Sequence, residues 1–131
     1  MYFGWYVFIR LFSNKSASSS VSTTKYFISK ISNEFEISTI LNYVEYKYNF
    51  TILHYICIGL DSISLEILSK AKLLNLLNGN IQDNSGNIFY HYFINNILNN
   101  NNITTEFKNS IFIMNKLFEN IKWNINIYNI D

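Results

Sequence analysis

The chain reads Asn49-Phe50-Thr51-Ile52-Leu53-His54-Tyr55-Ile56 in its middle and Gly86-Asn87-Ile88-Phe89-Tyr90-His91-Tyr92-Phe93 further on. Both stretches open on a residue that tolerates positive φ, and both carry a histidine inside an apolar run. The two histidines are 37 residues apart, and a period of about 20–50 residues is the signature of repeat proteins. We therefore predict that the chain repeats one small structural unit at least twice.

The motifs around these histidines resemble those of ankyrin repeats. Thr51-Ile52-Leu53-His54 is similar to the family's Thr-Pro-Leu-His motif, with Ile in place of Pro. Asn80-Ile81-Gln82-Asp83 followed by Gly86 resembles the family's Asn-x-x-Asp-x-x-Gly turn, whereas the second copy of the first motif keeps only its histidine. The residues that carry the resemblance are Thr51, Leu53, His54, Asn80, Asp83, Gly86 and His91.

The resemblance implies an all-α fold, a short ankyrin-type solenoid of helix pairs joined by β-turn-like loops. In such repeats the threonine caps a helix and meets the histidine side chain, and the leucine fills the core between stacked helices. A turn position with positive φ takes glycine, and asparagine is the next best residue there, so Asn49 can replace it. Apolar spacing predicts further helices over 62–77 and 111–123, and the Asn-rich residues 99–102 open a loop insertion.

Composition and the resemblance together set the expected organisation of the chain. The divisions are residues 1–24 as an apolar then Ser-rich N-terminal tail and linker, 25–45 as a decayed first repeat or cap, 46–82 as a repeat, 83–128 as a repeat with an Asn-rich insertion, and 129–131 as the start of a truncated repeat. The degenerate repeat domain thus covers 25–131. A stack without a polar C-terminal cap would leave apolar residues near 111–123 exposed, so we expect self-association through that end.

Composition excludes some classes of function and leaves others open. The net charge is +1, so no long-range field attracts nucleic acid, and we expect no nucleic-acid partner. Asn, Ile, Lys, Tyr and Phe, the residues of A/T-rich codons, dominate the chain. Together with the long Asn-rich insertion, this bias resembles the degenerate ankyrin proteins of large DNA viruses, pox-like or mimivirus-like, and also protozoan ones.

We expect no enzyme activity, no metal and no cofactor. His54, Cys57 and His91 could be read as a metal site, but stacked repeats hold equivalent side chains about 10 Å apart, too far to share one zinc ion. Cys57 lies between isoleucines, so a buried core residue is favoured over a reactive thiol. The single cysteine excludes an intramolecular disulfide and fits a cytoplasmic location, that of the host if the chain is viral.

These observations favour a protein that binds a partner protein. In repeat proteins the concave face, built from the turns and the first helices, carries the contacts. The residues assigned to this face by their position in the resemblance are Tyr48, Phe50, Gln82, Asn84, Asn87 and Phe89.

Two other interpretations stay open at this point. Residues 1–12, Met-Tyr-Phe-Gly-Trp-Tyr-Val-Phe-Ile-Arg-Leu-Phe, are apolar but too short to span a bilayer. They could anchor a small membrane-associated or secreted helical protein through membrane contact at the N-terminus. The chain could also be a decaying paralogue without a function.

Overall fold

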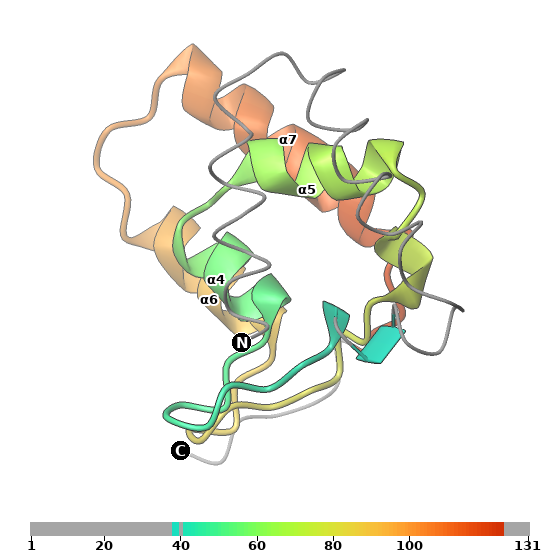
Figure 1. Ribbon diagram of the computed structural model, residues 1–131. Helices are drawn as coiled ribbons and strands as arrows, with labels where there is room; N and C mark the ends of the chain where they lie inside the picture. Colours follow the sequence, from blue (N-terminus) through green and yellow to red (C-terminus); the bar gives the residue numbers. More distant parts are fainter. Residues whose placement is uncertain (1–37, 40, 125–131) are drawn as a thin grey trace.

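The computed structural model describes residues 38, 39 and 41–124. In this part of the chain all the main secondary structure is helical, with β structure limited to one isolated bridge between Asn78 and Lys122. The helices are α4 (Ile52–Ile58), α5 (Ser62–Lys70), the 3-10 helix η1 (Leu74–Leu76), α6 (Phe89–Leu98) and α7 (Thr105–Phe118). The fold is therefore all-α, as predicted (Figure 1).

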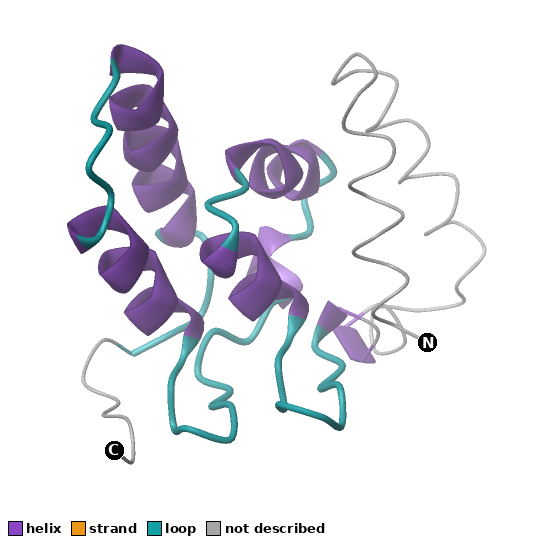
Figure 2. Cartoon of the chain, turned by 90° about the vertical axis from the view of Figure 1, so that its left-hand side faces the viewer, coloured by secondary structure: helices purple, strands orange, loops and turns teal. Residues whose placement is uncertain are grey.

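The four α-helices form two consecutive pairs, α4 with α5 and α6 with α7. The pairs are stacked, because α4 packs against α6 and α5 packs against α7. The turn segments that precede α4 and α6 project side by side from the same edge of the stack (Figure 2). Among the described residues, the second helix pair thus repeats the arrangement of the first.

Polar side chains define where three of the helices begin. The Thr51 hydroxyl accepts a hydrogen bond from the backbone N–H of His54 at the start of α4. Asp61 Oδ1 accepts from Ser64 N at 3.1 Å before α5, and Thr104 Oγ1 accepts from Phe107 N at 3.0 Å before α7. Each bond satisfies a backbone donor that has no partner within its helix.

The second helix is shorter than the predicted span of 62–77. It ends at Lys70 because Lys72 adopts a positive φ of 61° and turns the chain. Lys72 N then donates to Ser69 O at 2.9 Å and Leu73 N to Leu68 O at 3.0 Å, which is the Schellman pattern of helix termination. Leu74–Leu76 continue as a separate 3-10 turn.

The prediction of a last helix over 111–123 was wrong at both ends. α7 starts six residues earlier, after the cap Thr104, and stops at Phe118. Residues 99–104 form the connection between α6 and α7, so the Asn-rich stretch is a loop as predicted. We call α4 with α5 the first unit and α6 with α7 the second. The extra residues of the second unit also lengthen its helices: α6 has 10 residues where α4 has 7, and α7 has 14 where α5 has 9.

Aromatic rings fill the core of the second unit. Phe118 meets Phe89 at 4.9 Å and Phe93 at 4.8 Å between ring centroids, and Phe89 also meets Trp123 at 5.2 Å. Gly79 is required beside them, because a Cβ there would lie 2.6 Å from both the Phe89 ring and the Trp123 Cβ. The loop before α6 can therefore pass directly over these rings.

Three residues expected at an open C-terminal end belong instead to this core. Met114 and Phe118 of α7 are buried, since α7 packs against α5 and the Phe118 ring meets Phe89 and Phe93 of α6; Ile121, which follows the end of α7, is buried in the same cluster. Of the predicted first repeat or cap at 25–45, only residues 38, 39 and 41–45 are described. The predicted tail 1–24 and the predicted repeat start 129–131 lie outside the described residues.

Candidate functional site

A carboxylate organises the turn before α4. The Glu45 side chain accepts backbone hydrogen bonds from Lys47 at 3.0 Å, Tyr48 at 2.7 Å and Phe50 at 3.2 Å. Asn49 in this turn has a φ of 60°, so it takes the left-handed conformation expected for a glycine substitute. Sequence reasoning missed Glu45, although an acidic residue shortly before a left-handed asparagine is a recognisable signal for such a turn.

Glu45 has a lowered pKa as a result of these contacts. Burial acts to raise the pKa of the carboxyl, but the hydrogen bonds from the three backbone N–H groups outweigh it and stabilise the charged form. Glu45 N also donates to Phe50 O at 3.0 Å, which closes the turn.

Asp83 likewise accepts backbone hydrogen bonds and so organises the turn before α6. Its Oδ1 accepts from Ser85 N and Asn87 N, both at 2.9 Å, and its Oδ2 accepts from the Tyr92 hydroxyl. Gly86 has a φ of 81°, the conformation that Asn49 takes in the first turn. Asp83 and Gly86 thus occupy the turn positions that their motif predicted.

The two turns are joined by backbone contacts at their tips. Asn84 N donates to Tyr48 O at 3.0 Å, and Asn84 Nδ2 donates to Lys47 O at 3.1 Å. Within the second turn, Gln82 Nε2 donates to Gly86 O at 2.8 Å. The structure therefore brings Tyr48 and Asn84, two of the predicted contact residues, next to each other.

His54 connects α4 to the second turn. Its Nδ1 accepts from Thr51 N at 3.0 Å and lies 2.9 Å from the Thr51 hydroxyl, while its Nε2 lies 2.9 Å from Asn87 O. Since a backbone N–H donates to Nδ1 and a carbonyl faces Nε2, the ring is neutral with its proton on Nε2. Burial lowers the pKa of His54, and the hydrogen bond to Asn87 offsets only part of that effect.

His91 repeats the capping half of this arrangement. Its Nδ1 accepts from Ile88 N at 2.9 Å, as the Nδ1 of His54 accepts from Thr51 N. Asn80 makes a similar link one unit on, because its Oδ1 accepts from Asn124 N at 2.7 Å, just as Asn42 Oδ1 accepts from Asn78 N at 2.7 Å. Equivalent residues therefore make equivalent contacts in the two units.

The predicted contact residues differ in their exposure. Tyr48, Gln82 and Asn84 are exposed. Asn87 is half-buried, and its backbone carbonyl and N–H form hydrogen bonds with His54 Nε2 and Asp83 Oδ1. Phe89 was wrongly assigned to this surface: it is only 1% exposed, because its ring packs against the core rings of the second unit.

Phe50 also has a largely internal role. Its ring lies 5.3 Å from Tyr48, 5.5 Å from His54, 5.4 Å from Tyr55 and 5.8 Å from Tyr92, so it is the centre of an aromatic cluster between the turns and the first helices. Tyr46, which the position-based assignment left out, is 91% exposed at the tip of the first turn. The signal for it was an aromatic residue in a polar turn.

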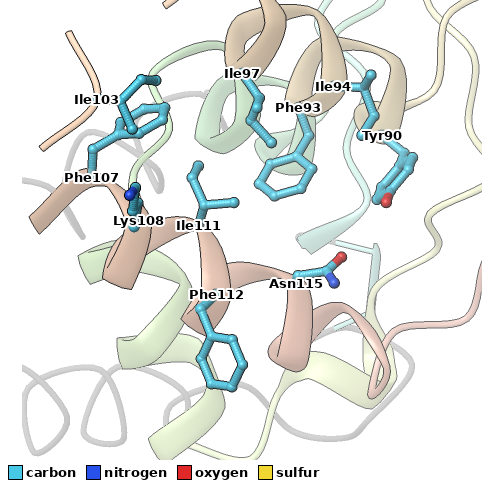
Figure 3. Close-up of a pocket in the computed structure, with 10 residues that line it drawn as sticks. All are labelled: Tyr90, Phe93, Ile94, Ile97, Ile103, Phe107, Lys108, Ile111, Phe112 and Asn115. Carbon is cyan, nitrogen blue, oxygen red and sulfur yellow. The ribbon is translucent and has the colours of Figure 1, made fainter. Parts of the chain in front are cut away.

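A hollow lies between α6 and α7 (Figure 3). It has a volume of about 510 Å³ and one charged side chain, Lys108, among its lining residues. Phe93 and Ile111 face each other across it, and the Phe112 ring points away from the other labelled side chains (Figure 3). Its walls are formed by Tyr90, Phe93, Ile94, Ile97, Ile103, Phe107, Lys108, Ile111, Phe112 and Asn115.

The one cysteine and the acidic and histidine side chains of the described residues are not arranged as a reactive or metal-binding site. Cys57 is fully buried in α4, and burial raises the pKa of its thiol well above the ordinary value. Residues 38, 39 and 41–124 contain no group of three or more His, Cys, Asp or Glu side chains that could hold a metal ion. No helix in the same part of the chain is long and apolar enough to cross a membrane. The features that stand out are surfaces: the turn tips and the α6–α7 hollow.

Comparison of the chain with protein-family models, with curated proteins and with solved structures gave no match. The resemblance to ankyrin repeats therefore rests on the sequence motifs alone.

Proposed function

We propose that this chain is a degenerate ankyrin-type repeat protein that binds a partner protein through its turns and first helices. The observation that carries the proposal is the repeated cap, in which His54 and His91 accept the backbone N–H three residues earlier at 3.0 and 2.9 Å. Two further features add support: the left-handed backbone conformation of Asn49 and Gly86, and the packing of α4 against α6. The histidine cap and the left-handed turn residue thus recur in two consecutive units, whereas the contact between threonine and histidine occurs in the first unit alone.

The proposed binding surface consists of the turn tips and the adjoining side of α6. Tyr46 and Tyr48 are exposed there beside Asn84, and Lys47 Nζ lies 5.1 Å from the Tyr48 ring centre. Tyrosine is favoured in protein interfaces because its rigid ring buries a large area and its hydroxyl can still form a hydrogen bond. The turns hold these residues at low entropic cost, because the carboxylates of Glu45 and Asp83 already fix the backbone.

We place this activity in the cytoplasm, that of a host if the chain is viral. The support is the single cysteine and the resemblance in composition to the ankyrin proteins of large DNA viruses. The alternative, a membrane-associated protein, depends on residues 1–12, which lie outside the described part. Fractionation of the tagged full chain separates the two, since recovery in a carbonate-resistant membrane pellet would contradict the cytoplasmic proposal.

Site-specific photo-crosslinking in cells that produce the full chain tests the binding surface. A photoreactive amino acid at Tyr46 or at Gln82 should give a discrete adduct with another protein. The matched control is Lys70, which is exposed at the end of α5, away from the turns. Adducts at the turn positions alone support the proposal.

A second set of variants makes the crosslinking result specific. Tyr48→Ser in the background of the crosslinker at Gln82 should reduce the adduct at least fivefold, because it removes the neighbouring aromatic ring and leaves the turn backbone intact. Equal adducts from Lys70, or adducts unchanged by Tyr48→Ser, would show that binding does not use this surface.

A further inference from the structure

Another hollow, which we call the α6 groove, lies along α6 beside the turn that precedes this helix. It has a volume of about 510 Å³, and none of its described lining residues is Asp, Glu, Lys or Arg. Since Asn87 belongs to that turn, the groove continues the surface formed by the turn tips. Its lining residues are Asn87, His91, Tyr92, Ile94, Asn95 and Leu98.

The groove contains a hydrogen-bond donor of known identity, the Nε2–H of His91. His91 Nδ1 accepts from Ile88 N at 2.9 Å, so the neutral ring carries its proton on Nε2. Among residues 38, 39 and 41–124, no acceptor meets that Nε2. The side chain is half-buried, so an acceptor that docks in the groove would satisfy this donor and gain a hydrogen bond.

The corresponding histidine of the first unit shows which groups cover such a donor. His54 Nε2 lies 2.9 Å from the backbone carbonyl oxygen of Asn87, and the Tyr92 ring lies 5.9 Å from the His54 ring between centroids. Asn87 and Tyr92 are only five residues apart in the chain. One short segment thus supplies both a backbone carbonyl and an aromatic ring to His54.

Apolar side chains lie beside His91 along the same helix. Ile94 is 37% exposed and Leu98 is 76% exposed, and residues four apart share one side of a helix. Cys57, which precedes Ile94 by the same 37 residues that separate the two histidines, is fully buried where α6 packs against α4. The groove therefore combines a free donor with an apolar row, as the covered surface of the first unit does.

We propose that the partner protein docks an uncharged polypeptide segment in the α6 groove, with a backbone carbonyl on His91 Nε2 and an apolar side chain on Ile94 and Leu98. This inference rests on the proposed function, because it specifies the partner's chemistry at that same surface. An aromatic side chain is favoured, since a ring occupies the equivalent place beside His54. A charged side chain is disfavoured, because no lining residue offers an opposite charge to compensate its desolvation.

NMR titration of the full 131-residue, ¹⁵N-labelled chain with a defined peptide tests the proposal. The probe is Asn-Ile-Phe-Tyr-His-Tyr, the sequence of residues 87–92 with blocked ends, because this stretch supplies the carbonyl and the ring that meet His54. It should bind with a dissociation constant on the order of 1 mM, as for a flexible ligand that loses conformational freedom on binding. The largest shifts should occur at His91 Nε2, Ile94 and Leu98.

Two variants and a salt series make the titration specific. Leu98→Asp should weaken peptide binding by at least about fivefold, because it places an uncompensated charge in the groove. The matched control is Phe112→Asp, since Phe112 is 67% exposed but does not line the α6 groove. This control, and a rise in salt from about 50 to 500 mM, should change the constant by less than about twofold, because no ion pair contributes. Circular dichroism establishes that both variants are folded.

Three results of the titration would overturn the proposal. They are no binding of the peptide up to about 5 mM, shifts that lie away from α6, and equal weakening by Leu98→Asp and Phe112→Asp.

A photoreactive amino acid at Asn95 identifies what occupies the groove. With the purified full chain and the peptide, it should give an adduct with the peptide. An adduct within one chain, or between two copies, would show that the chain's own residues fill the groove, and would also overturn the proposal. None of these results affects the turn tips, whose contact with a cellular partner is tested separately by the crosslinks at Tyr46 and Gln82.

Discussion

The His54 ring makes two hydrogen bonds that both depend on the neutral imidazole. A proton on Nδ1 would face the Thr51 N–H, which now donates to it at 3.0 Å, and would place a charge in a buried site. Asp83 favours that charge and His91 opposes it, but burial is the larger effect and lowers the pKa of His54. Protonation therefore acts against the link from α4 to Asn87.

This geometry predicts a loss of stability in acid. A group whose pKa is lower in the folded state contributes stability that is complete above its unfolded pKa, which is about 6.5 for histidine, and that is lost as the pH falls below it. The thermal midpoint should fall between pH 7.5 and pH 5 in the wild-type chain. The fall should be smaller in His54→Gln, since glutamine can donate to Asn87 O but does not titrate.

His91→Gln is the comparison for this measurement, because His91 caps α6 in the same way but is less buried. It should keep most of the wild-type pH dependence. If His91→Gln flattened the profile and His54→Gln left it unchanged, the assignment of the effect to His54 would be wrong.

Both helices of the first pair, α4 and α5, are followed by a residue other than glycine that adopts a positive φ. α4 is followed by Leu60 with a φ of 48° and α5 by Lys72 with a φ of 61°. In each case the next residue donates back into the last turn, from Asp61 N to Ile56 O at 2.8 Å and from Leu73 N to Leu68 O at 3.0 Å. The hydrogen bonds stabilise a conformation that residues with a Cβ rarely adopt.

Glycine at the second of these positions should strengthen the helix end. We expect Lys72→Gly to raise the free energy of unfolding by about 0.5–1 kcal/mol, because it removes the steric cost of the left-handed conformation. The substituted side chain is exposed, so little packing is lost. Urea denaturation followed by circular dichroism measures the change.

Lys70→Gly provides the control within the same helix. Lys70 is the last residue of α5 and has a helical backbone, so glycine there should destabilise the chain by up to about 1 kcal/mol. A loss of stability with Lys72→Gly would show that the αL turn does not end α5 in solution.

At the scale of the whole molecule, stability depends on the stacking of the two units. Leu53, Ile56, Leu65 and Leu68 are buried in the same cluster as Phe93 and Met114 of the second unit. In addition, Asn96 Nδ2 of α6 donates hydrogen bonds to the Cys57 and Ile58 carbonyls, both at 2.9 Å. These bonds give partners to carbonyls at the C-terminal end of α4, where the helix itself supplies none. Neither pair can bury its apolar side without the other.

The two units should therefore unfold together. Leu53→Ala removes a side chain that is buried in this shared core and should cost about 2–5 kcal/mol. Hydrogen exchange should then show lower protection in α6 and α7 as well as in α4 and α5. Tyr46→Ser, at an exposed position, should change stability by less than about 0.5 kcal/mol, and unchanged protection in α6 and α7 after Leu53→Ala would show that the units are independent.

The amino-acid sequence was sufficient for the features that depend on local chemistry. Thr51 and His54 cap a helix, Asn49 and Gly86 adopt positive φ, and Asp83 closes a turn, all as predicted. Such features follow from contacts between residues close in the chain, so a short motif contains most of the information needed to predict them.

Only the tertiary structure decided which apolar residues are covered and which are not. Phe89 and Phe112 are both aromatic residues in apolar runs, yet Phe89 lies against Phe118 and Trp123 while Phe112 faces solvent. The difference arises because Phe118 and Trp123, which follow Phe89 by 29 and 34 positions, pack against its ring, and because Gly79 lets the chain pass close to it. Burial is set by packing between distant segments, and periodicity within one helix indicates only that one side is apolar, not what lies against it.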